Sequence, residues 1–292
     1  MQPNHPIIMS NCILVPTDFS KNASHAFDYA IILAKKEKAK ILLLHAYHIT
    51  YITPDVPADF MAIEIENAEK TAIKKMKFLV EKIKHENLEC EVFLRQDMAV
   101  DLILEVAKDR HPDFIVIGTT GASGLEEIIM GNITATVIAK AKCPVIAVPK
   151  KASFKHIKHI TYATDYLVSD LYALKKLVEI AKLFNATITV VHISGELLTH
   201  ESEEEFMNKF KAKVRKKIKY DDIAYKLIYG RNFINTLEEY ILHESSDLLA
   251  MSTHLQSIYD KIFGKSNTKK MSYHSTIPFL AFHHKKESVI FI

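Results

Sequence analysis

Short apolar runs alternate with stretches of helical periodicity along the first half of the chain. The apolar runs are typical of buried strands, and residues that recur every three or four positions between them are typical of amphipathic helices. We expect strands at 12–16, 41–46, 90–94, 113–118 and 144–149. The first helix carries Ala23, Phe27, Ala30 and Ala34 on one face, with Ser20 as its expected N-cap, and later helices are expected at 62–86, 98–108 and 131–141.

The second half repeats this order of elements. Its apolar runs fall near 157–162, 187–193, 224–229, 247–252 and 278–283. Continuous apolar strands that alternate with helices predict a parallel sheet covered on both faces. We therefore expect an α/β protein with two tandem, doubly wound, Rossmann-like domains of five main strands each, at 1–150 and 151–292, joined by the polar, basic linker 149–159.

Identical residues recur between the halves at two constant offsets, first 147 and then 134 positions, which indicates a duplicated domain. The second copy is thus 13 residues shorter, and we place the shortening in the loop near 47–59. The recurring pairs are Ile13/Ile160, Thr17/Thr164, Asp18/Asp165, Ala26/Ala173, Ala34/Ala181, Lys35/Lys182, Ala39/Ala186, Ile41/Ile188, His45/His192, Asp113/Asp247, Thr119/Thr253, Thr134/Thr268, Pro144/Pro278 and Ala147/Ala281.

Composition narrows the class of protein. The chain has 292 residues, 48% of them hydrophobic and 25% charged, which excludes intrinsic disorder. A net charge of +3 gives no reason to expect nucleic acid as a partner, and no apolar run is long enough to span a membrane. Three dispersed cysteines without a CxxC pair argue against a disulfide framework and against a cysteine zinc site. Because no secretory signal precedes the first strand, we expect a cytoplasmic protein.

Glycine is rare and concentrated. Four of the seven glycines, Gly118, Gly121, Gly124 and Gly131, lie together after the fourth expected strand. Ligands of doubly wound sheets bind beyond the carboxyl ends of the strands, where 16–18, 45–46 and 118–121 meet. A helix N-terminus opened by glycine presents free backbone N–H groups, which suit a phosphate. The arrangement therefore favours a nucleotide, although a glycine-rich turn can also be a plain loop.

At these residues the chain resembles a known family. The segments VPTDFS (15–20), GTTGASGLEEIIMGNIT (118–134) and KCPVIAVP (142–149) are similar to those of universal stress protein domains, which have the adenine nucleotide alpha hydrolase-like fold. Nucleotide-binding members carry Gly, two residues, Gly, nine residues, Gly and then Ser or Thr. Gly118, Gly121 and Gly131 match that spacing, whereas Asn132 replaces the hydroxyl residue.

The resemblance implies a site for ATP, or for AMP or ADP, together with Mg. It implies an adenine and ribose pocket and a set of phosphate contacts. The alternative for Asp18 is that it only caps the turn after the first strand. The implied pocket residues are Pro16, Thr17, Asp18, Ala46, Ile117, Gly118, Thr119 and Gly121, and the implied phosphate contacts are Gly131, Asn132, Ile133 and Thr134.

The second copy departs from the motif. Ser252, Leu255 and Lys265 stand where the first copy has Gly118, Gly121 and Gly131. We expect no ATP binding there in the manner of the family, even if Gly264 serves as the third glycine. Its expected role is structural: the family often pairs its last strand across a two-fold axis, so PVIAVP and PFLAFH would pair within this chain as a pseudo-dimer, and a homodimer stays open.

Enzymatic signatures are missing. The sequence has no P-loop GxxxxGK[ST], no GxSxG and no HExxH, and we expect slow ATP hydrolysis at most. The leading hypothesis is a stress-associated regulatory protein that binds ATP in the first domain. The alternatives are a nucleotide-free interaction scaffold and a weak ATPase or nucleotidyl-transferring enzyme.

Other conspicuous residues are expected to be structural. His45 and His192 are placed inside strand ends, and Cys143 is expected to be a buried small hydrophobe. The acidic run 201–205, followed by the basic stretch 209–219, predicts a solvated helix whose charges suit its dipole, with a nucleic-acid or membrane surface as the alternative. The apolar tail 288–292 is expected to pair with a sheet edge or to pack on the other domain.

Overall fold

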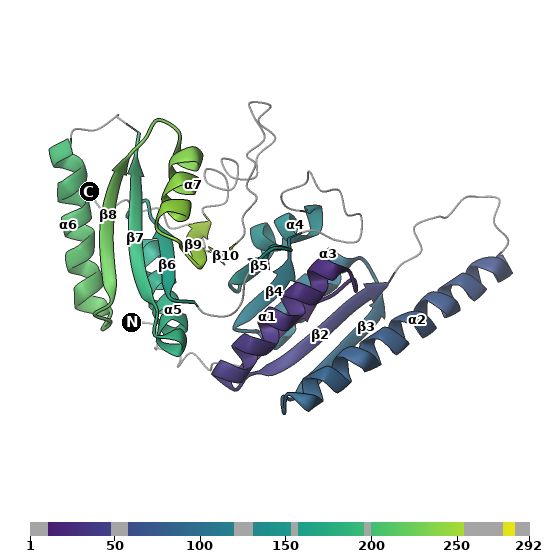
Figure 1. Ribbon diagram of the computed structural model, residues 1–292. Coiled ribbons are helices and arrows are strands. Elements are labelled where there is room, and N and C mark those ends of the chain that lie inside the picture. The colour runs from purple at the N-terminus through teal and green to yellow at the C-terminus, as the bar shows by residue number, and fades with distance from the viewer. Residues whose placement is uncertain are drawn as a thin grey trace, which may run out of the picture.

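The structure, a computed structural model, describes residues 11–47, 58–119, 131–152, 157–195, 200–253 and 277–283. These residues form one ten-stranded sheet with the order β3-β2-β1-β4-β5-β10-β9-β6-β7-β8, flanked by helices (Figure 1). All strand pairs are parallel except β5 with β10. We call residues 11–152 the N-terminal half and 157–283 the C-terminal half.

Each half contributes five strands to the sheet, which confirms the predicted α/β class and strand number. The N-terminal half contains β1 (Cys12–Pro16), α1 (Lys21–Glu37), β2 (Lys40–Tyr47), α2 (Ala58–His85), β3 (Cys90–Gln96), α3 (Ala99–Arg110), β4 (Phe114–Gly118), α4 (Asn132–Lys140) and β5 (Val145–Val148). The C-terminal half contains β6 (His159–Ala163), α5 (Val168–Phe184), β7 (Thr187–Ser194), α6 (His200–Lys217), β8 (Ile223–Tyr229), α7 (Phe233–His243), β9 (Leu248–Thr253) and β10 (Phe279–His283).

Two apolar clusters, one on each face of the sheet, run through both halves. One face packs against α1, α2, α5 and α6, and the other packs against α3, α4 and α7. Within a strand, alternate residues serve opposite faces, so that Ile13 and Val15 join the first cluster while Cys12 and Leu14 join the second. Burial on both faces explains why the strands are continuous apolar runs. Cys143 is a half-buried neighbour of the second cluster, and burial raises the pKa of its thiol to about 12.

The halves meet where β5 and β10 lie antiparallel, with Ile146 opposite Leu280. Beside this junction the Lys36 ammonium of α1 lies 5.4 Å from the centre of the Phe184 ring of α5. Hydrogen bonds across the junction join the two five-stranded sheets into one, so no strand edge is left open at this point.

Side chains bind the backbone at the starts of several elements. Ser20 caps α1 as predicted, since its hydroxyl accepts a hydrogen bond from the Ala23 N–H at 3.1 Å. The repeated aspartates bind backbone at the amino ends of the first strands: Asp113 accepts from the Cys12 N–H, and Asp247 accepts from the N–H groups of Lys158 and His159. These contacts give a structural reason for the recurrence of the two residues.

The second copy is shorter mainly because one of its helices is shorter, so the prediction that the loop near 47–59 accounts for the difference is wrong for most of it. Helix α2 has 28 residues, whereas its counterpart α6 has 18, so most of the difference is helix. A sequence offset locates a deletion only between two matched blocks, and helix length inside the gap depends on packing. The tail 288–292, together with Leu255, Gly264 and Lys265, lies outside the described residues.

Candidate functional site

The turn between β1 and α1 is held by its own side chains. The Thr17 hydroxyl accepts from the Phe19 N–H at 3.0 Å, and an Asp18 carboxylate oxygen accepts from the Ser20 N–H at 2.9 Å. Phe19 adopts a left-handed backbone with φ of 62°, which turns the chain sharply into the helix. Asp18 therefore caps its own turn, as one of its two interpretations requires, while its side chain remains exposed and Thr17 is buried.

His45 fastens the end of β2 to this turn. Its Nδ1 lies 2.7 Å from the Thr17 carbonyl oxygen, and its ring packs on Phe19 with centroids 4.3 Å apart. Burial lowers the pKa of His45, which outweighs the opposite effects of the Thr17 carbonyl and Asp18. The neutral imidazole thus donates from Nδ1, and the histidine is a structural tie between two strand ends, as expected from the sequence.

Gly118, at the end of β4, lies against the first turn of α1. A Cβ at this position would stand 3.0 Å from the Asn22 amide nitrogen and 3.1 Å from the Asn22 carbonyl group. The Asn22 amide also reaches the Thr119 hydroxyl at 3.4 Å. The close approach that Gly118 permits is therefore to a helix of the same chain, a reason that the motif spacing alone does not reveal.

The end of β4 is also bonded to the start of α4. The Gly131 N–H donates to the Thr119 carbonyl at 2.6 Å, and the Thr134 hydroxyl donates to the Gly118 carbonyl at 2.7 Å. Thr134 is buried, and its side chain supports the strand end. Any contact between Thr134 and a phosphate would therefore come from its backbone N–H.

The N-terminus of α4 is open to solvent. Gly131 is the N-cap and has no side chain to bond the first N–H groups, and Asn132 and Ile133 are exposed. The first N–H groups of a helix have no partner within the helix, and the helix dipole adds partial positive charge there. This end of the N-terminal half can accept an anion.

The structure brings most of the predicted site residues to one edge of the sheet. Pro16 lies opposite Leu44 of β2, which places Ala46 level with the turn after β1, and β1 also pairs with β4, which ends in Ile117 and Gly118. Pro16 and Ile117 are buried, and Ala46 is half-buried. Gly121 lies outside the described residues.

The same edge of the C-terminal half is occupied by a buried carboxylate. Asp170 accepts hydrogen bonds from the Tyr162 hydroxyl at 2.7 Å, the Thr164 hydroxyl at 2.7 Å and the Leu167 N–H at 3.0 Å. The Ser252 hydroxyl lies 3.1 Å from that of Tyr162. Burial raises the pKa of Asp170, although its hydrogen bonds act in the opposite direction.

A second group of buried polar side chains lies at the end of β7. The Ser194 hydroxyl donates to Glu203 at 2.7 Å, and the other carboxylate oxygen of Glu203 lies 3.4 Å from His192 Nε2. His192 Nδ1 lies 2.7 Å from the Thr164 carbonyl, as His45 does from Thr17. The expectation that 201–205 is a solvated helix start is wrong for Glu203, because its carboxylate finds these partners inside the protein.

The repeat offsets match these residues between the halves. Tyr162, Asp170 and Ser252 take the positions of Val15, Ala23 and Gly118. The C-terminal half thus places three linked polar side chains where the N-terminal half has small or apolar groups. The two strand-end regions share a backbone plan and differ in what fills them.

Motif reasoning missed Asn22, Asp170 and Glu203. A usable sign existed for Asn22, since it falls four residues before Ala26, on the buried side of α1. Asp170 is six residues after Thr164 in the repeated turn, at a position that holds Ala23 in the first copy. Such a change of a small residue to a carboxylate within a repeat marks a local difference in packing.

The fold and this edge define a class of protein: a doubly wound α/β protein whose strand ends and helix N-termini form a potential ligand site. The Universal stress protein family matches residues 9–149. A universal stress protein of Methanocaldococcus jannaschii is 33% identical over 144 residues, which are 47% of this chain and 81% of that protein. Universal stress protein YxiE of Bacillus subtilis is 30% identical over 148 residues, which are 48% of this chain and 99% of that protein. The chain belongs to the universal stress protein family.

A solved structure resembles nearly the whole chain. The universal stress protein of Archaeoglobus fulgidus DSM 4304 aligns with a TM-score of 0.70 and 17% identity, over 94% of this chain and 98% of that one. The likeness establishes that both halves share an overall fold with that protein. No helix within the described ranges is long and apolar enough to cross a membrane.

Proposed function

We propose that the protein is a stress-associated regulatory protein. It binds ATP, or another adenine nucleotide, at the strand ends of the N-terminal half. The observation that carries the proposal is the open N-terminus of α4, capped by Gly131 beside the end of β4. Its N–H groups suit phosphate oxygens, and the Asn132 amide adds a donor. The exposed Asp18 carboxylate suits a ribose hydroxyl or the adenine amino group. The residues present therefore fit the nucleotide that the family resemblance implies.

We assign a supporting role to the C-terminal half. Its strand ends carry the Asp170 group, and Ser252 replaces Gly118, which argues against a second nucleotide there. The antiparallel pairing of β5 with β10 supports the idea that residues 1–150 and 151–292 are two domains that pair as a pseudo-dimer. The role proposed is regulatory rather than catalytic, with Mg accompanying ATP as the resemblance implies.

The first test is titration of the full chain with MgATP by calorimetry, after denaturing extraction to detect co-purified nucleotide. One site per chain with micromolar affinity, about −8 kcal/mol, supports the proposal. Gly131→Val should abolish binding because its side chain stands where the phosphates would lie. Gly131 has φ of −66°, a conformation that valine adopts readily, so the variant should remain folded.

Gly195→Val is the matched control. Gly195 follows β7 at the corresponding edge of the C-terminal half, and a Cβ there meets nothing within 4 Å. The proposal requires this variant to bind MgATP as the unchanged protein does. Two sites per chain would contradict the assigned role of the C-terminal half.

A nucleotide-free scaffold is the second candidate. This candidate is favoured because two of the expected ligand contacts already have structural partners. The Thr134 hydroxyl donates to the Gly118 carbonyl, and the Asp18 carboxylate accepts from the Ser20 N–H. Absence of binding for MgATP, ADP and AMP, with no nucleotide in the extract, would select the scaffold and overturn the first proposal.

A further inference from the structure

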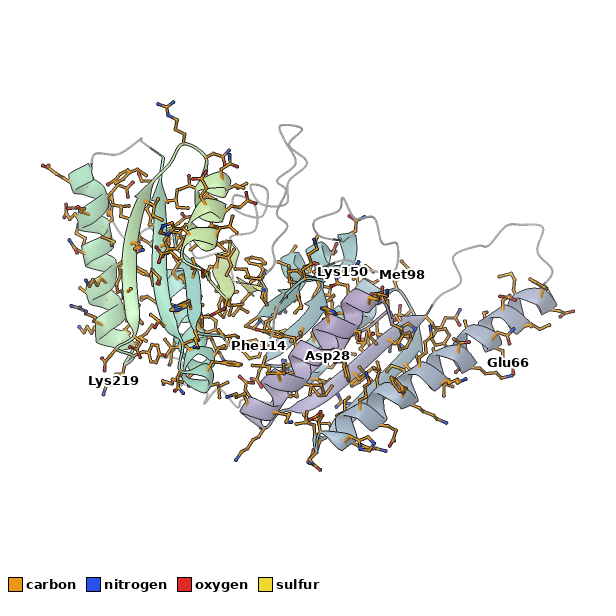
Figure 2. All side chains as sticks on the ribbon, viewed as in Figure 1. Asp28, Glu66, Met98, Phe114, Lys150 and Lys219 are labelled. Atoms are coloured by element: carbon orange, nitrogen blue, oxygen red, sulfur yellow. The ribbon has the colours of Figure 1, made fainter. Side chains whose placement is uncertain are left out.

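Helix α2 extends far beyond the sheet that it covers. From Asp59 to Thr71 no side chain is buried, whereas Ala72, Met76, Leu79 and Ile83 further along are buried against the sheet. Figure 1 shows the N-terminal part of α2 reaching past the ends of β2 and β3, and Figure 2 labels Glu66 on this part. A helix of about 12 residues is only marginally stable in water on its own, so this length calls for a packing partner.

A second stripe of residues runs along the outer side of α2. Its members follow a spacing of alternately four and three residues, which brings them onto one face as in a coiled coil. All are exposed except the half-buried Val80, with 54% exposure for Ile63 and 37% for Ile73. The outer stripe consists of Asp59, Ile63, Glu66, Lys70, Ile73, Lys77, Val80 and Lys84.

The charges of the outer stripe are divided between its ends. The first half, from Asp59 to Lys70, holds both acidic residues, Asp59 and Glu66, together with Lys70, whereas the second half, from Ile73 to Lys84, holds the basic residues Lys77 and Lys84 and no acidic one. The stripe is therefore complementary to itself in the antiparallel direction. An interface between two identical chains about a two-fold axis requires this property, because the same patch must match its own reverse.

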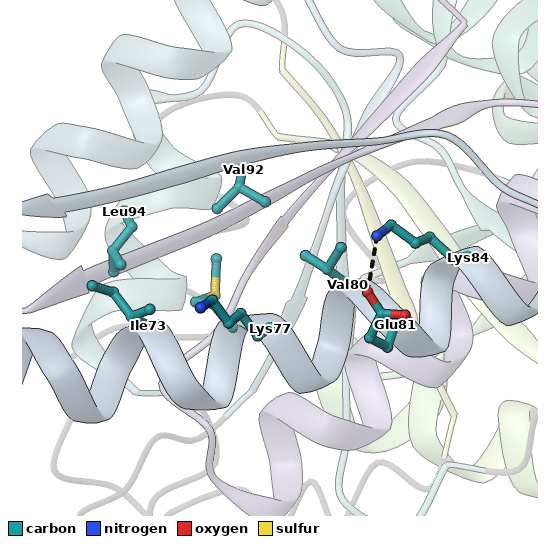
Figure 3. A pocket seen from close by; sticks show the side chains of 8 residues that line it. Ile73, Lys77, Val80, Glu81, Lys84, Val92 and Leu94 are labelled. Carbon is teal, nitrogen blue, oxygen red and sulfur yellow. Dashed lines mark hydrogen bonds and ion pairs between the residues drawn. The ribbon is translucent and has the colours of Figure 1, made fainter.

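A groove adjoins the basic half of the stripe. It has a volume of about 540 Å³ and lies between α2 and the edge strand β3. Figure 3 shows Ile73 and Val80 of α2 on one side, and Val92 and Leu94 of β3 on the other. Val92 is 43% exposed on a strand that ends the sheet, so the groove offers apolar surface that nothing among the described residues covers.

We propose that α2 is a homodimer interface, in which a second copy of the chain lays the acidic half of its α2 along the basic half of this one. In the antiparallel register that centres the stripe on the two-fold axis, Asp59 meets Lys84, Ile63 meets Val80, Glu66 meets Lys77 and Lys70 meets Ile73 of the opposite helix. Each Ile63 then enters the groove beside β3 of the other chain. The ion pairs within α2, Lys70 with Glu66 and Lys84 with Glu81, are exposed and can exchange partners at little cost.

Charge reversal tests the register. Sedimentation equilibrium of the full chain should give twice its mass of 33.3 kDa. Glu66→Lys should raise the dimer dissociation constant by about tenfold or more, because the symmetry turns two attractive pairs into repulsive ones. Adding Lys77→Glu to the same chain should restore the dimer, since both pairs are then attractive again. Ile63→Glu should give a monomer.

Two exposed residues of α2 outside the stripe provide the controls. Glu64→Lys makes the same charge change as Glu66→Lys, and Phe78→Glu removes an apolar side chain that is 62% exposed. Both should leave the dimer unchanged, and circular dichroism should show that every variant is folded. A monomeric chain at tens of micromolar, a dimer that Glu66→Lys and Ile63→Glu do not weaken, or a failure of the double reversal to restore association would overturn the proposal.

Discussion

The carboxyl ends of the strands are built alike in the two halves and filled differently. Each half has a Thr-Asp turn after its first strand and a histidine that reaches the threonine carbonyl at 2.7 Å. The N-terminal half then has Ala23 and Gly118, whereas the C-terminal half has Asp170 and Ser252. In the C-terminal half, the buried Asp170 carboxylate accepts hydrogen bonds from groups around the end of the first strand. In the N-terminal half, Ala23 and Gly118 have no polar side chain that could form such bonds.

This difference shows how a duplicated fold can keep one backbone plan and fill its strand ends with different side chains. The backbone of the edge depends on the strands, the turn and the histidine, which both halves keep. Only a few side chains decide whether a network of buried polar groups forms around the end of the first strand. The asymmetry of α2 and α6 has the same character, because ten extra residues of helix in one half create a surface that the other half lacks.

The largest effect is expected for Asp170→Ala. The variant leaves the buried hydroxyl groups of Tyr162 and Thr164 and the Leu167 N–H without their acceptor, so the free energy of unfolding should fall by about 3 kcal/mol. Urea unfolding measures this change. Asp165→Ala, an exposed aspartate in the same turn, should cost less than about 1 kcal/mol; an equal loss for both would show that the buried network stabilises nothing.

The next effect concerns Gly118. In Gly118→Ala the new Cβ meets the Asn22 backbone and amide, and the free energy of unfolding should fall by about 2 kcal/mol. The C-terminal half accommodates Ser252 with Ser169 in place of Asn22, so Asn22→Ser should recover part of that loss in the double variant. Recovery in thermal melts would confirm that helix packing requires this glycine, and no recovery would contradict it.

A smaller effect depends on pH. Burial raises the pKa of Glu37 to about 7, helped by Asp113 and opposed by Lys176, and the repeat places Phe184 at the equivalent position. Because the folded protein holds this proton more tightly than the unfolded chain does, stability should fall as the pH rises from about 4.5 to about 7.

Glu37→Gln removes this dependence. The variant should be more stable than the unchanged protein by about 1 to 2 kcal/mol at pH 8, and similar to it at pH 4. Denaturant unfolding at the two pH values measures the difference. A variant that gains the same stability at both would show that the proton has no part in it.

The smallest effect is expected for Tyr166→Phe, a substitution that gives the C-terminal half the residue type of the N-terminal half. Among the described residues no hydrogen-bond partner reaches the buried Tyr166 hydroxyl, and the equivalent residue is Phe19. Tyr166→Phe should raise the free energy of unfolding by about 0.5 to 1 kcal/mol, since it removes an unsatisfied polar group. Thermal melts at neutral pH test this, with Tyr162→Phe as the control that should destabilise the protein because it breaks the bond to Asp170.

Much of the candidate site could be predicted because its parts are local in sequence. Ser20 precedes its helix directly, and the Thr17 turn needs only contacts within two residues. The reason for Gly118 could not be predicted, because its neighbour Asn22 is 96 positions away and approaches only when α1 packs on β4. The expectation for Glu203 failed for a related reason. A run of charged residues usually lies in solvent, and whether one of them is buried depends on which face of the helix packs against the sheet.

The sequence by itself determined the family, the α/β class, the duplication and the five strands of each half, because hydrophobic period, turn residues and repeat offsets are properties of the chain. Tertiary structure decided the rest. It joined the halves through β5 and β10, placed Asp170 among three donors and carried α2 beyond the sheet. These features depend on contacts between distant residues, whose free energy exists only once the strands have been set side by side.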